Sequence, residues 1–365
     1  MNLGKAKTAK VCAAAALSAF LIMRVGAAEP GNSYLVQNLV SDGSIAATHM
    51  DPLLINAWGL AALPTSPWWV ADNETNVSTL YDAAGEMRPL VVQVPGGPTG
   101  IVSYAGTGFV VTTATASGPA RFMFAAEDGT ISAWSPTVSQ TQSSIVVPNA
   151  SAPAHGAIYK GLALARTTSG DFLYAADFHN NRVDVFDSSF HPVLAARFAD
   201  PGLPEGFAPF GIQLISGRIF VAYAKQDEDA EDEVAGEGLG FVSAFNPDGT
   251  FVARVASGDP LNAPWGMALA PANFGRFSGD LLVGNFGNGR LNAFDPTTFE
   301  PKGHLKDTHG KAVVIDGLWG IGFGNDGAAG PVNALYFAAG PNDESAGLFG
   351  RIDPHEPVRT KHDRH

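Results

Sequence analysis

A three-residue signature with a central glycine recurs six times along the chain. Its first residue is aromatic or polar and its third is apolar; the copies are Trp58-Gly59-Leu60, Thr99-Gly100-Ile101, Lys160-Gly161-Leu162, Phe210-Gly211-Ile212, Trp265-Gly266-Met267 and Trp319-Gly320-Ile321. Self-similarity at a spacing of about 20 to 50 residues, or slightly more, marks a repeat architecture. The chain is therefore predicted to consist of six similar units.

Each signature is followed by strand-like segments in a fixed order. An apolar run ending in small residues comes first, at 68–71, 122–125, 172–175, 219–222, 281–284 and 335–338. An alternating segment follows a turn, at 77–82, 130–134, 182–187, 241–246, 290–295 and 348–353. Candidate fourth strands are 90–94, 144–147, 193–198, 251–255 and 302–305. Short alternating runs between turn signals are typical of antiparallel strands, so we predict an all-β, six-bladed β-propeller.

The signature glycines are expected on the innermost strand of each blade. There the blades converge on the axis, and glycine permits close approach of neighbouring backbones. Trp58, Trp265 and Trp319 are expected to pack between blades, because large aromatic side chains dominate core burial. The content of 42 glycines and 25 prolines in 365 residues agrees with a turn-rich, single β domain.

The two ends of the repeat region complement each other. An apparent strand at Tyr34 to Val40 precedes the first signature, and the sixth repeat has no fourth strand after Asp353. Pairing the two would close the ring and cover an open sheet edge, which is otherwise prone to aggregation. The propeller is thus predicted to span residues 29–353, followed by a polar tail at 354–365.

The N-terminus has the three zones of a secretory signal peptide. Lys5, Lys7 and Lys10 precede an apolar stretch from Val11 to Met23, and small residues follow before Glu29. The apolar stretch is too short to span a bilayer. We predict a signal peptide at residues 1–28 and export to the periplasm or the medium; the alternative is an uncleaved anchor, because Arg24 follows the apolar zone.

The predicted mature chain is strongly acidic. Without residues 1–28 it has 18 basic and 35 acidic residues, a net charge of −17. That balance argues against nucleic acid or an anionic membrane as a partner, and we expect a monomer without stable membrane insertion. The only cysteine, Cys12, lies in the predicted signal peptide, so no disulfide or thiolate metal site is expected in the mature protein.

Candidate functional residues lie in the loops that join the second and third strands of the blades. Loops of one type emerge on one face of a propeller, and such loops commonly carry function. The candidate ligand-binding residues on or beside them are Asn73, Asp177, His179, Lys225, Gln226, Asp227, Asn285, Asn342 and Asp343, together with Lys160 from a signature. Lys225-Gln226-Asp227 and Asn342-Asp343-Glu344 occur once each in six repeats, as expected of functional residues and also of drifting loops.

The loop from Lys225 to Glu233 carries six carboxylates. So many acids in one loop make calcium or another divalent cation conceivable there, although the EF-hand spacing is absent and charge runs are usually solvated. There is no nucleophile elbow, zinc-protease motif, phosphate-binding loop or haem-attachment motif. No firm cofactor follows from the sequence.

Several longer motifs resemble a family of exported bacterial proteins without an assigned activity. They include Trp69-Val70-Ala71-Asp72-Asn73, Tyr223-Ala224-Lys225-Gln226-Asp227, residues 263–271, residues 282–290 and Ala339-Gly340-Pro341-Asn342-Asp343-Glu344. Some members carry a PEP-CTERM sorting tail, and the single repeats are similar to NHL repeats. The resemblance implies an exported six-bladed propeller and names no catalytic residue. The polar end of this chain, Arg351 to His365, departs from the tailed members.

Two classes of function remain open. The first, which we favour, is a binding module whose loop face holds a protein, a glycan or a small molecule. The second is a metal-dependent hydrolase resembling the propeller lactonases, in which carboxylates and amides around the axis hold a divalent cation. That class expects an acidic ligand near the start of an innermost strand, where this chain has Asn56, Lys160 and Pro209. A purely structural extracellular role is a third alternative.

Overall fold

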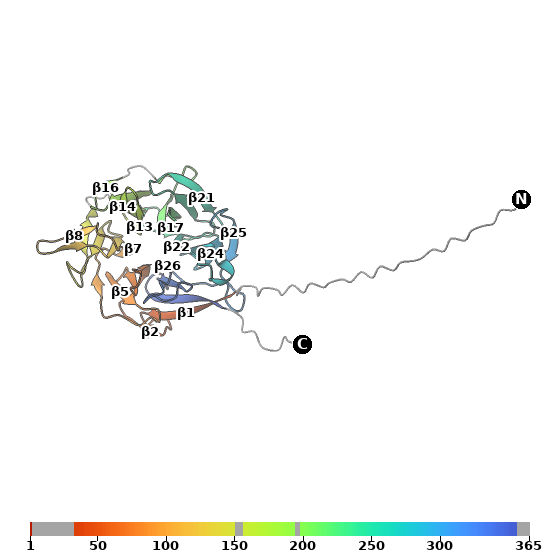
Figure 1. Ribbon diagram of the computed structural model, residues 1–365, viewed down its shortest axis with the longest axis horizontal. Coiled ribbons are helices and arrows are strands. Elements are labelled where there is room, and N and C mark those ends of the chain that lie inside the picture. Colours follow the sequence, from red (N-terminus) through yellow and green to blue (C-terminus); the bar gives the residue numbers. More distant parts are fainter. Residues whose placement is uncertain (2–32, 150–155, 194–197, 356–365) are drawn as a thin grey trace.

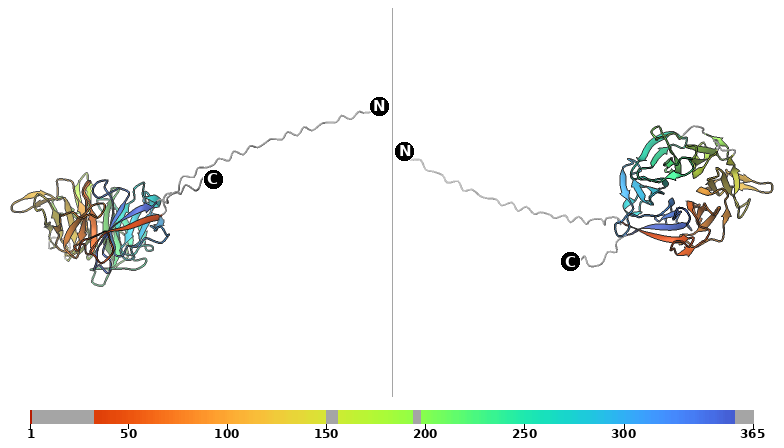
Figure 2. Two further views of the ribbon diagram at one scale, coloured as in Figure 1. Left: turned by 90° about the horizontal axis from the view of Figure 1, so that it is seen from below. Right: turned by 180° about the vertical axis from the view of Figure 1, so that it is seen from behind.

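The computed structural model describes Met1 and residues 33–149, 156–193 and 198–355. The predicted signal peptide and the tail beyond His355 lie outside these residues. Six antiparallel sheets surround a central axis (Figure 1), and the molecule is a thick disc when seen from the side (Figure 2). The prediction of a six-bladed, all-β propeller is confirmed. No described segment forms a helix with the length and apolarity needed to cross a membrane.

Each blade has four main strands, ordered from the axis outward. The first two blades are β3 (Ala57–Ala61), β4 (Trp68–Asp72), β5 (Val77–Tyr81), β6 (Val92–Gln93), and β7 (Pro98–Ser103), β10 (Phe122–Ala126), β11 (Ile131–Trp134), β12 (Ser144–Val147). The next two are β13 (Tyr159–Thr167), β14 (Gly170–Asp177), β15 (Arg182–Asp187), β16 (Pro192–Val193), and β17 (Phe207–Ile215), β18 (Arg218–Gln226), β20 (Phe241–Phe245), β21 (Phe251–Ser257). The fifth is β22 (Pro264–Leu269), β23 (Leu281–Asn285), β24 (Leu291–Phe294), β25 (Pro301–His304).

Two short additions lie outside this pattern. A hairpin of β8 (Val110–Thr112) and β9 (Ser117–Pro119) is inserted in the second blade, and β19 (Glu233–Val234) pairs with the end of β18 in the fourth. The fourth strand of the first blade is shorter than predicted. Pro89 and Pro95 flank β6, and proline cannot donate to a ladder. Residues 194–197, at the end of the predicted strand beside β16, lie outside the described residues.

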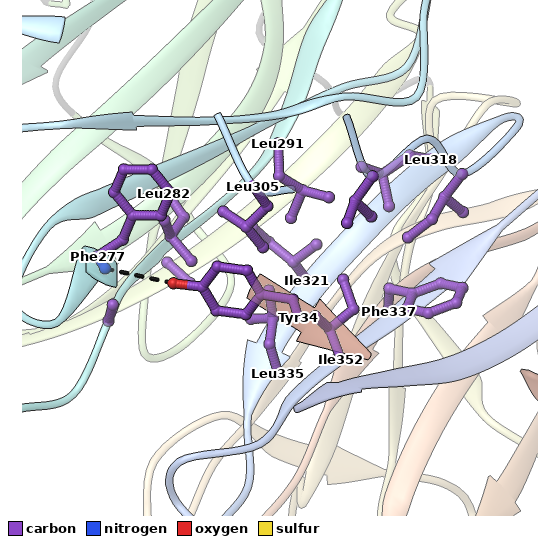
Figure 3. Close-up of a cluster of buried hydrophobic side chains, with 14 of the residues drawn as sticks. Tyr34, Phe277, Leu282, Leu291, Leu305, Leu318, Ile321, Leu335, Phe337 and Ile352 are labelled. Atoms are coloured by element: carbon purple, nitrogen blue, oxygen red, sulfur yellow. Dashed lines mark hydrogen bonds between the residues drawn. The ribbon is translucent and has the colours of Figure 1, made fainter. Parts of the chain in front are cut away.

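The sixth blade is completed by the N-terminal strand. It contains β26 (Leu318–Phe323), β27 (Leu335–Ala339), β28 (Leu348–His355) and β1 (Ser33–Ser41), with β2 (His49–Met50) beside β1. β1 pairs with β28 from Ser33 opposite His355 to Ser41 opposite Leu348, so the predicted closure is confirmed. Tyr34 is 1% exposed among apolar side chains of the fifth and sixth blades (Figure 3), and its hydroxyl donates to the Phe274 carbonyl at 3.0 Å.

The signature glycines are required where the innermost strands meet. A Cβ atom on Gly100 would lie 2.2 Å from the amide nitrogen of Leu162, and one on Gly211 would lie 2.0 Å from the Trp265 carbonyl oxygen. One on Gly320 would lie 2.6 Å from the Trp58 carbonyl oxygen, across the junction between the last and first blades. Each glycine therefore lets its blade approach the next, as predicted.

Candidate functional site

Two sets of equivalent positions from the six blades surround the axis at the starts of the innermost strands. The first set is the first residue of each signature: Trp58, Thr99, Lys160, Phe210, Trp265 and Trp319. The second set lies at or just beyond the end of the second strand: Asn73, Glu127, Phe178, Ala224, Phe286 and Gly340; of these, only Ala224 lies within its strand, paired with Ala208. Their equivalence follows from matching backbone bonds; for example, the amides of Phe178 and Phe286 donate to the carbonyls of Ile158 and Ala263, both at 2.9 Å.

Aromatic members of these two sets form a plug on the axis. The rings of Trp58 and Trp319 stack with centroids 3.6 Å apart, and the ring of Phe286 also stacks with that of Trp319, with centroids 4.0 Å apart. Trp265 meets Trp58 and Trp319 edge-on at 6.2 and 5.9 Å. The three tryptophans thus pack against one another at the centre of the ring, beyond the predicted packing between neighbouring blades.

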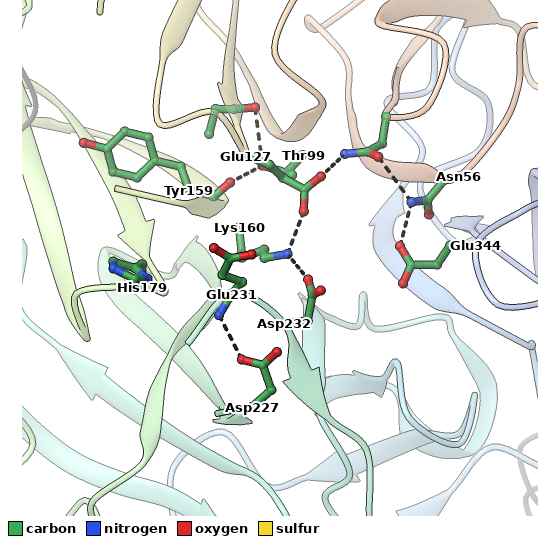
Figure 4. A network of polar contacts seen from close by, with 12 residues as sticks. Asn56, Thr99, Glu127, Tyr159, Lys160, His179, Asp227, Glu231, Asp232 and Glu344 are labelled. Carbon is green, nitrogen blue, oxygen red and sulfur yellow. Dashed lines mark hydrogen bonds and ion pairs between the residues drawn. The ribbon is translucent and has the colours of Figure 1, made fainter. Parts of the chain in front are cut away.

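Lys160 is the cationic member of the first set, and its side chain is buried. It is 2% exposed, and its ammonium pairs with Glu127 Oε1 at 2.6 Å and with Asp232 Oδ1 at 3.0 Å (Figure 4). The ammonium also lies over the Trp58 ring, 5.3 Å from the centroid. Carboxylates and an aromatic face together form a recognition site for an ammonium group.

A chain of hydrogen bonds extends this cluster across the axis. Asn73 Nδ2 donates to Glu127 Oε2 at 2.8 Å, and Asn56 Nδ2 donates to Asn73 Oδ1 at 3.3 Å and to Glu344 Oε2 at 2.6 Å. The Trp319 indole donates to Asn56 Oδ1 at 3.1 Å. We call Glu127, Lys160, Asp232, Glu233 and Glu344, with these two asparagines, the axial site. It lies on the face of the loops between second and third strands.

The electrostatics of the axial site are shaped by burial and excess acid. Burial alone would lower the pKa of Lys160, but the carboxylates of Glu127, Glu233 and Asp232 outweigh it and the pKa is raised. Burial raises the pKa of Glu233 to about 8, with the charge of Lys160 opposing the rise and Glu344 adding to it. Burial also raises the pKa of Glu344. At neutral pH the site thus holds a fixed ammonium and a carboxyl group that retains a proton.

The acidic loop after β18 reaches the axis through Asp232 and Glu233. The Asp227 carboxylate accepts from the Glu231 amide at 2.9 Å, and the Asp227 amide donates to the Asp232 carbonyl at 2.9 Å. A ring nitrogen of His179 lies 3.2 Å from the Ala230 carbonyl oxygen, and Gln226 Nε2 donates to the Phe178 carbonyl at 2.7 Å. Asp227, His179 and Gln226, which are predicted site residues, therefore hold the loop that carries two of the axial carboxylates.

The remaining predicted residues lie farther from the axis. Asp177 and Asn285 are fully buried at the last position of β14 and β23, where Asp177 accepts from Asn180 and Asn285 donates to the Pro260 carbonyl. Lys225 is partly exposed, with its ammonium 5.5 Å from the centre of the Phe207 ring. Asn342 and Asp343 are exposed. Of the predicted side chains, Lys160 and Asn73 are members of the axial site.

The sequence analysis did not single out Glu127, Asp232, Glu233 or Glu344 as site residues, although each lies in a loop that it selected. Glu127 has a sequence signal: it occupies the same position in its blade as Asn73. Glu344 reaches the axis because Asn342, Asp343 and Glu344 all adopt left-handed backbone angles, with φ of 58°, 51° and 63°. Such a run is uncommon for residues other than glycine, so it is hard to foresee from sequence.

The axial site can bind cations and exchange protons. Its carboxylates are oxygen ligands of the kind that bind ammonium groups or hard metal ions. Within the described residues, no three acidic or histidine side chains are grouped as a metal ion would require. Lys160 already holds Glu127 and Asp232, so a metal ion would have to compete with its ammonium for these oxygens.

Comparison with known proteins identifies two viral relatives of nearly full length, while no family model matches the chain. The chain is 33% identical over 343 residues to "Uncharacterized protein R648" of Acanthamoeba polyphaga mimivirus, covering 91% of this chain and 83% of the relative. It is 33% identical over 331 residues to "Uncharacterized protein L690" of the same virus, covering 88% and 86%.

Solved structures with a similar fold include two bacterial enzymes. The soluble aldose sugar dehydrogenase of Escherichia coli matches with a TM-score of 0.53 and 14% identity, over 88% of this chain and 100% of that one. Virginiamycin B lyase of Staphylococcus aureus matches with a TM-score of 0.52 and 12% identity, over 88% and 99%. At these identities the likeness shows the propeller fold alone, and one fold can host unrelated activities.

Proposed function

The chain belongs to the family of the mimivirus proteins R648 and L690, and from the chemistry of its axial site we propose that it is a binding protein for a small organic cation. The observation that carries this proposal is the excess of acidic over basic side chains on the axis. Four acidic side chains, those of Glu127, Asp232, Glu233 and Glu344, lie around the single ammonium of Lys160, and three of them remain to carry negative charge when Glu233 retains its proton.

The way the protein holds Lys160 supports an amine as the ligand. Two carboxylate oxygens and the Trp58 ring contact this ammonium, which are the contacts that recognise free amines. Glu233 and Glu344 offer a second acidic position beside it. The Trp58 indole nitrogen is buried without a hydrogen-bond partner among the described residues, so it could donate to a polar group of a ligand.

Proton uptake by the site supports the same proposal. Since the pKa of Glu233 is raised to about 8, the empty site retains a proton near neutral pH that an incoming cation would displace. Binding is then expected to release a proton and to tighten as the pH rises from 6 to 9. Electrostatic attraction of this kind also weakens with salt.

A metal-dependent hydrolase is the second candidate. Amide and carboxylate oxygens of Asn56, Asn73, Glu127 and Glu344 form a continuous network that could supply ligands. The Lys160 ammonium repels any cation beside it, but it repels a divalent ion, which carries both charges at one point, about twice as strongly as one ammonium group; two unit charges about 4 Å apart already cost roughly 4 kcal/mol at an effective dielectric constant of 20. Calcium affinity therefore distinguishes the two candidates.

Isothermal titration calorimetry with 1,4-diaminobutane, calcium chloride and glucose tests the proposal. We expect saturable binding of the diamine only, with proton release visible as a dependence of the heat on the buffer. The double variant Glu233→Gln/Glu344→Gln should weaken binding at least tenfold, whereas Glu237→Gln, a nearby exposed residue, should not. Equal binding of glucose, or no binding of the diamine, would refute the proposal; calcium binding with micromolar affinity would favour the hydrolase.

We further propose that the protein is exported. The support is the order of basic, apolar and small-residue zones before Glu29. Mass spectrometry of the protein from its native source should find a chain beginning near Glu29. An intact segment from Met1 to Ala28 in the processed fraction would contradict this.

A further inference from the structure

The axial site holds more negative charge than one ammonium group can balance. When Glu233 retains its proton, the carboxylates of Glu127, Asp232 and Glu344 face the single ammonium of Lys160, so three negative charges and one positive charge leave a net charge of −2. A cation that displaces the Glu233 proton enters a site with one further negative charge. A ligand with a single positive charge would then leave the net charge at −2, whereas a dication would reduce it to −1.

Carboxyl oxygens without a partner among the described residues occur at two places in the site. Glu233 is mostly buried, and no other described residue donates a hydrogen bond to its carboxyl group. Beside it, Glu344 uses only Oε2, which accepts from Asn56. Asp232 uses only Oδ1, which contacts Lys160, and its side chain is 73% exposed. One acidic position is therefore buried at Glu233 and Glu344, and the other lies at the surface at Asp232.

The two positions are separated by the backbone of the hairpin that β18 and β19 form. The Asp227 amide donates to the Asp232 carbonyl, and Glu233 pairs with Gln226. Successive side chains of an extended chain point to opposite sides, which agrees with the exposure of Asp232 and the burial of Glu233. Both carboxyl groups nevertheless act on the ammonium of Lys160. A ligand with its charges at two ends can contact both positions, whereas a compact ion cannot.

Separated charges also suit the presence of Lys160. Coulomb repulsion falls as the distance between two charges increases. A chain molecule that places one charge at the buried position and the other at the surface keeps its two charges at different distances from the Lys160 ammonium. It is repelled less than a divalent metal ion, whose charges are at one point. Carboxylate oxygens accept hydrogen bonds, so they favour ammonium groups that carry N–H donors.

We propose that the axial site binds an organic dication with a primary ammonium group at each end of a short chain, one group held by Glu233 and Glu344 and the other by Asp232. This inference rests on the proposed function and narrows its ligand from a small organic cation to an α,ω-diamine. Asp232 is then the residue that distinguishes a diamine from a monoamine.

Isothermal titration calorimetry of the full chain with 1,4-diaminobutane and 4-amino-1-butanol tests this inference at pH 8, where alkyl amines are protonated. The two molecules share one carbon chain, and the amino alcohol has a hydroxyl group in place of the second amine. The diamine should bind at least tenfold more tightly. Asp232→Asn should reduce this affinity ratio at least threefold. Asp229→Asn is the matched control, because it removes the same charge from an exposed residue of the same hairpin, and it should leave the ratio unchanged.

Three results would overturn the inference, and they separate it from the proposed function. If the amino alcohol binds as tightly as the diamine, one ammonium group suffices; the inference then fails while the proposed cation binding stands. If neither molecule binds, both fail. If the diamine binds more tightly but the affinity ratio is the same in Asp232→Asn and Asp229→Asn, the second ammonium group does not lie at Asp232. The comparison of the two ligands on the parent protein does not depend on the folding of any variant.

Discussion

Replacing Lys160 by methionine should destabilise the protein more than any other single change of charge in the axial site. Methionine keeps most of the length and the apolar stem, while the ammonium is lost. Glu127 and Asp232 would then face each other, with Glu344 and Glu233 nearby, without the cation that now lies 2.6 and 3.0 Å from two of them. Removing one partner of a buried ion pair costs about 3 to 5 kcal/mol.

Solvent exposure of the carboxylates sets the expected value within this range. Lys160 is buried, but the side chains of Glu127 and Asp232 are 33% and 73% exposed, so water can partly replace the ammonium. We therefore expect a loss near the lower end, about 3 kcal/mol in the free energy of unfolding. Lys225→Met is the control; this partly exposed lysine has its ammonium over the Phe207 ring, and its loss should cost less than about 1 kcal/mol.

Urea denaturation at pH 8 and pH 5 measures both quantities. The charge of Lys160 lowers the pKa of Glu233 and of Glu344, so both pKa values should rise further without it, and protonation at pH 5 then relieves part of the repulsion. The deficit of Lys160→Met should be smaller at pH 5 than at pH 8, whereas that of Lys225→Met should change little. A deficit at pH 8 no larger than that of the control would refute the assignment of Lys160 as the cation that stabilises the axial carboxylates.

Three other perturbations test separate features. In Glu233→Gln, the free energy of unfolding should fall between pH 5 and pH 9 by about 2 kcal/mol less than in the parent. The pKa of Glu233 rises from 4.5 in the unfolded chain to about 8 in the folded one, so the folded state binds the proton more tightly and this stabilisation is lost as the pH rises through 8; the full shift at 1.36 kcal/mol per pKa unit is an upper bound. Parallel pH profiles of the two proteins would contradict this prediction. Deleting residues 34–40 should abolish the cooperative thermal transition or cause aggregation, because β28 loses its partner strand; unchanged solubility and melting temperature would show that the closure is dispensable. Gly211→Ala should cost about 3 kcal/mol, since its Cβ would lie 2.0 Å from a backbone oxygen, whereas Gly217→Ala, with nothing within 4 Å but φ of +78°, should cost about 1 to 2 kcal/mol in chemical denaturation.

The fold could be predicted in detail because the same local pattern is repeated six times. The predicted run 68–71 corresponds to β4 (Trp68–Asp72), and the predicted strand 144–147 coincides with β12 (Ser144–Val147). Closure by Tyr34 to Val40 followed from counting strands at the two ends, and pairing of β1 with β28 confirms it. Repetition supplies this information because an error in one copy is corrected by the other five.

The axial site could be predicted only in part, because its side chains come from loops whose paths are not repeated. The sequence indicated the face on which the axial site lies and its acidic loop, but not that β19 and the Asp227 carboxylate would fold this loop so that Asp232 reaches Lys160. The approach of Glu344 depends on its left-handed backbone. Such contacts depend on tertiary structure, and the local residue pattern does not determine them.

Side-chain alternation explains why neighbouring polar residues at the ends of second strands have different roles. Successive side chains of a strand point to opposite sides, so an offset of one residue reverses the direction. Asp72, Asp177 and Asn285 share the last position of their strands and are buried away from the axis, and the residues after them, Asn73, Phe178 and Phe286, belong to the axial set. In three of the six blades the equivalent strand position holds an acid or amide, as expected of a structural role in the turn. The residue that follows varies between blades. Glu127 pairs there with Lys160, and Asn73 is connected to Lys160 through its hydrogen bond to Glu127. In this propeller, it is therefore variation at an axis-facing position, more than polarity near a strand end, that distinguishes the residues of the axial site.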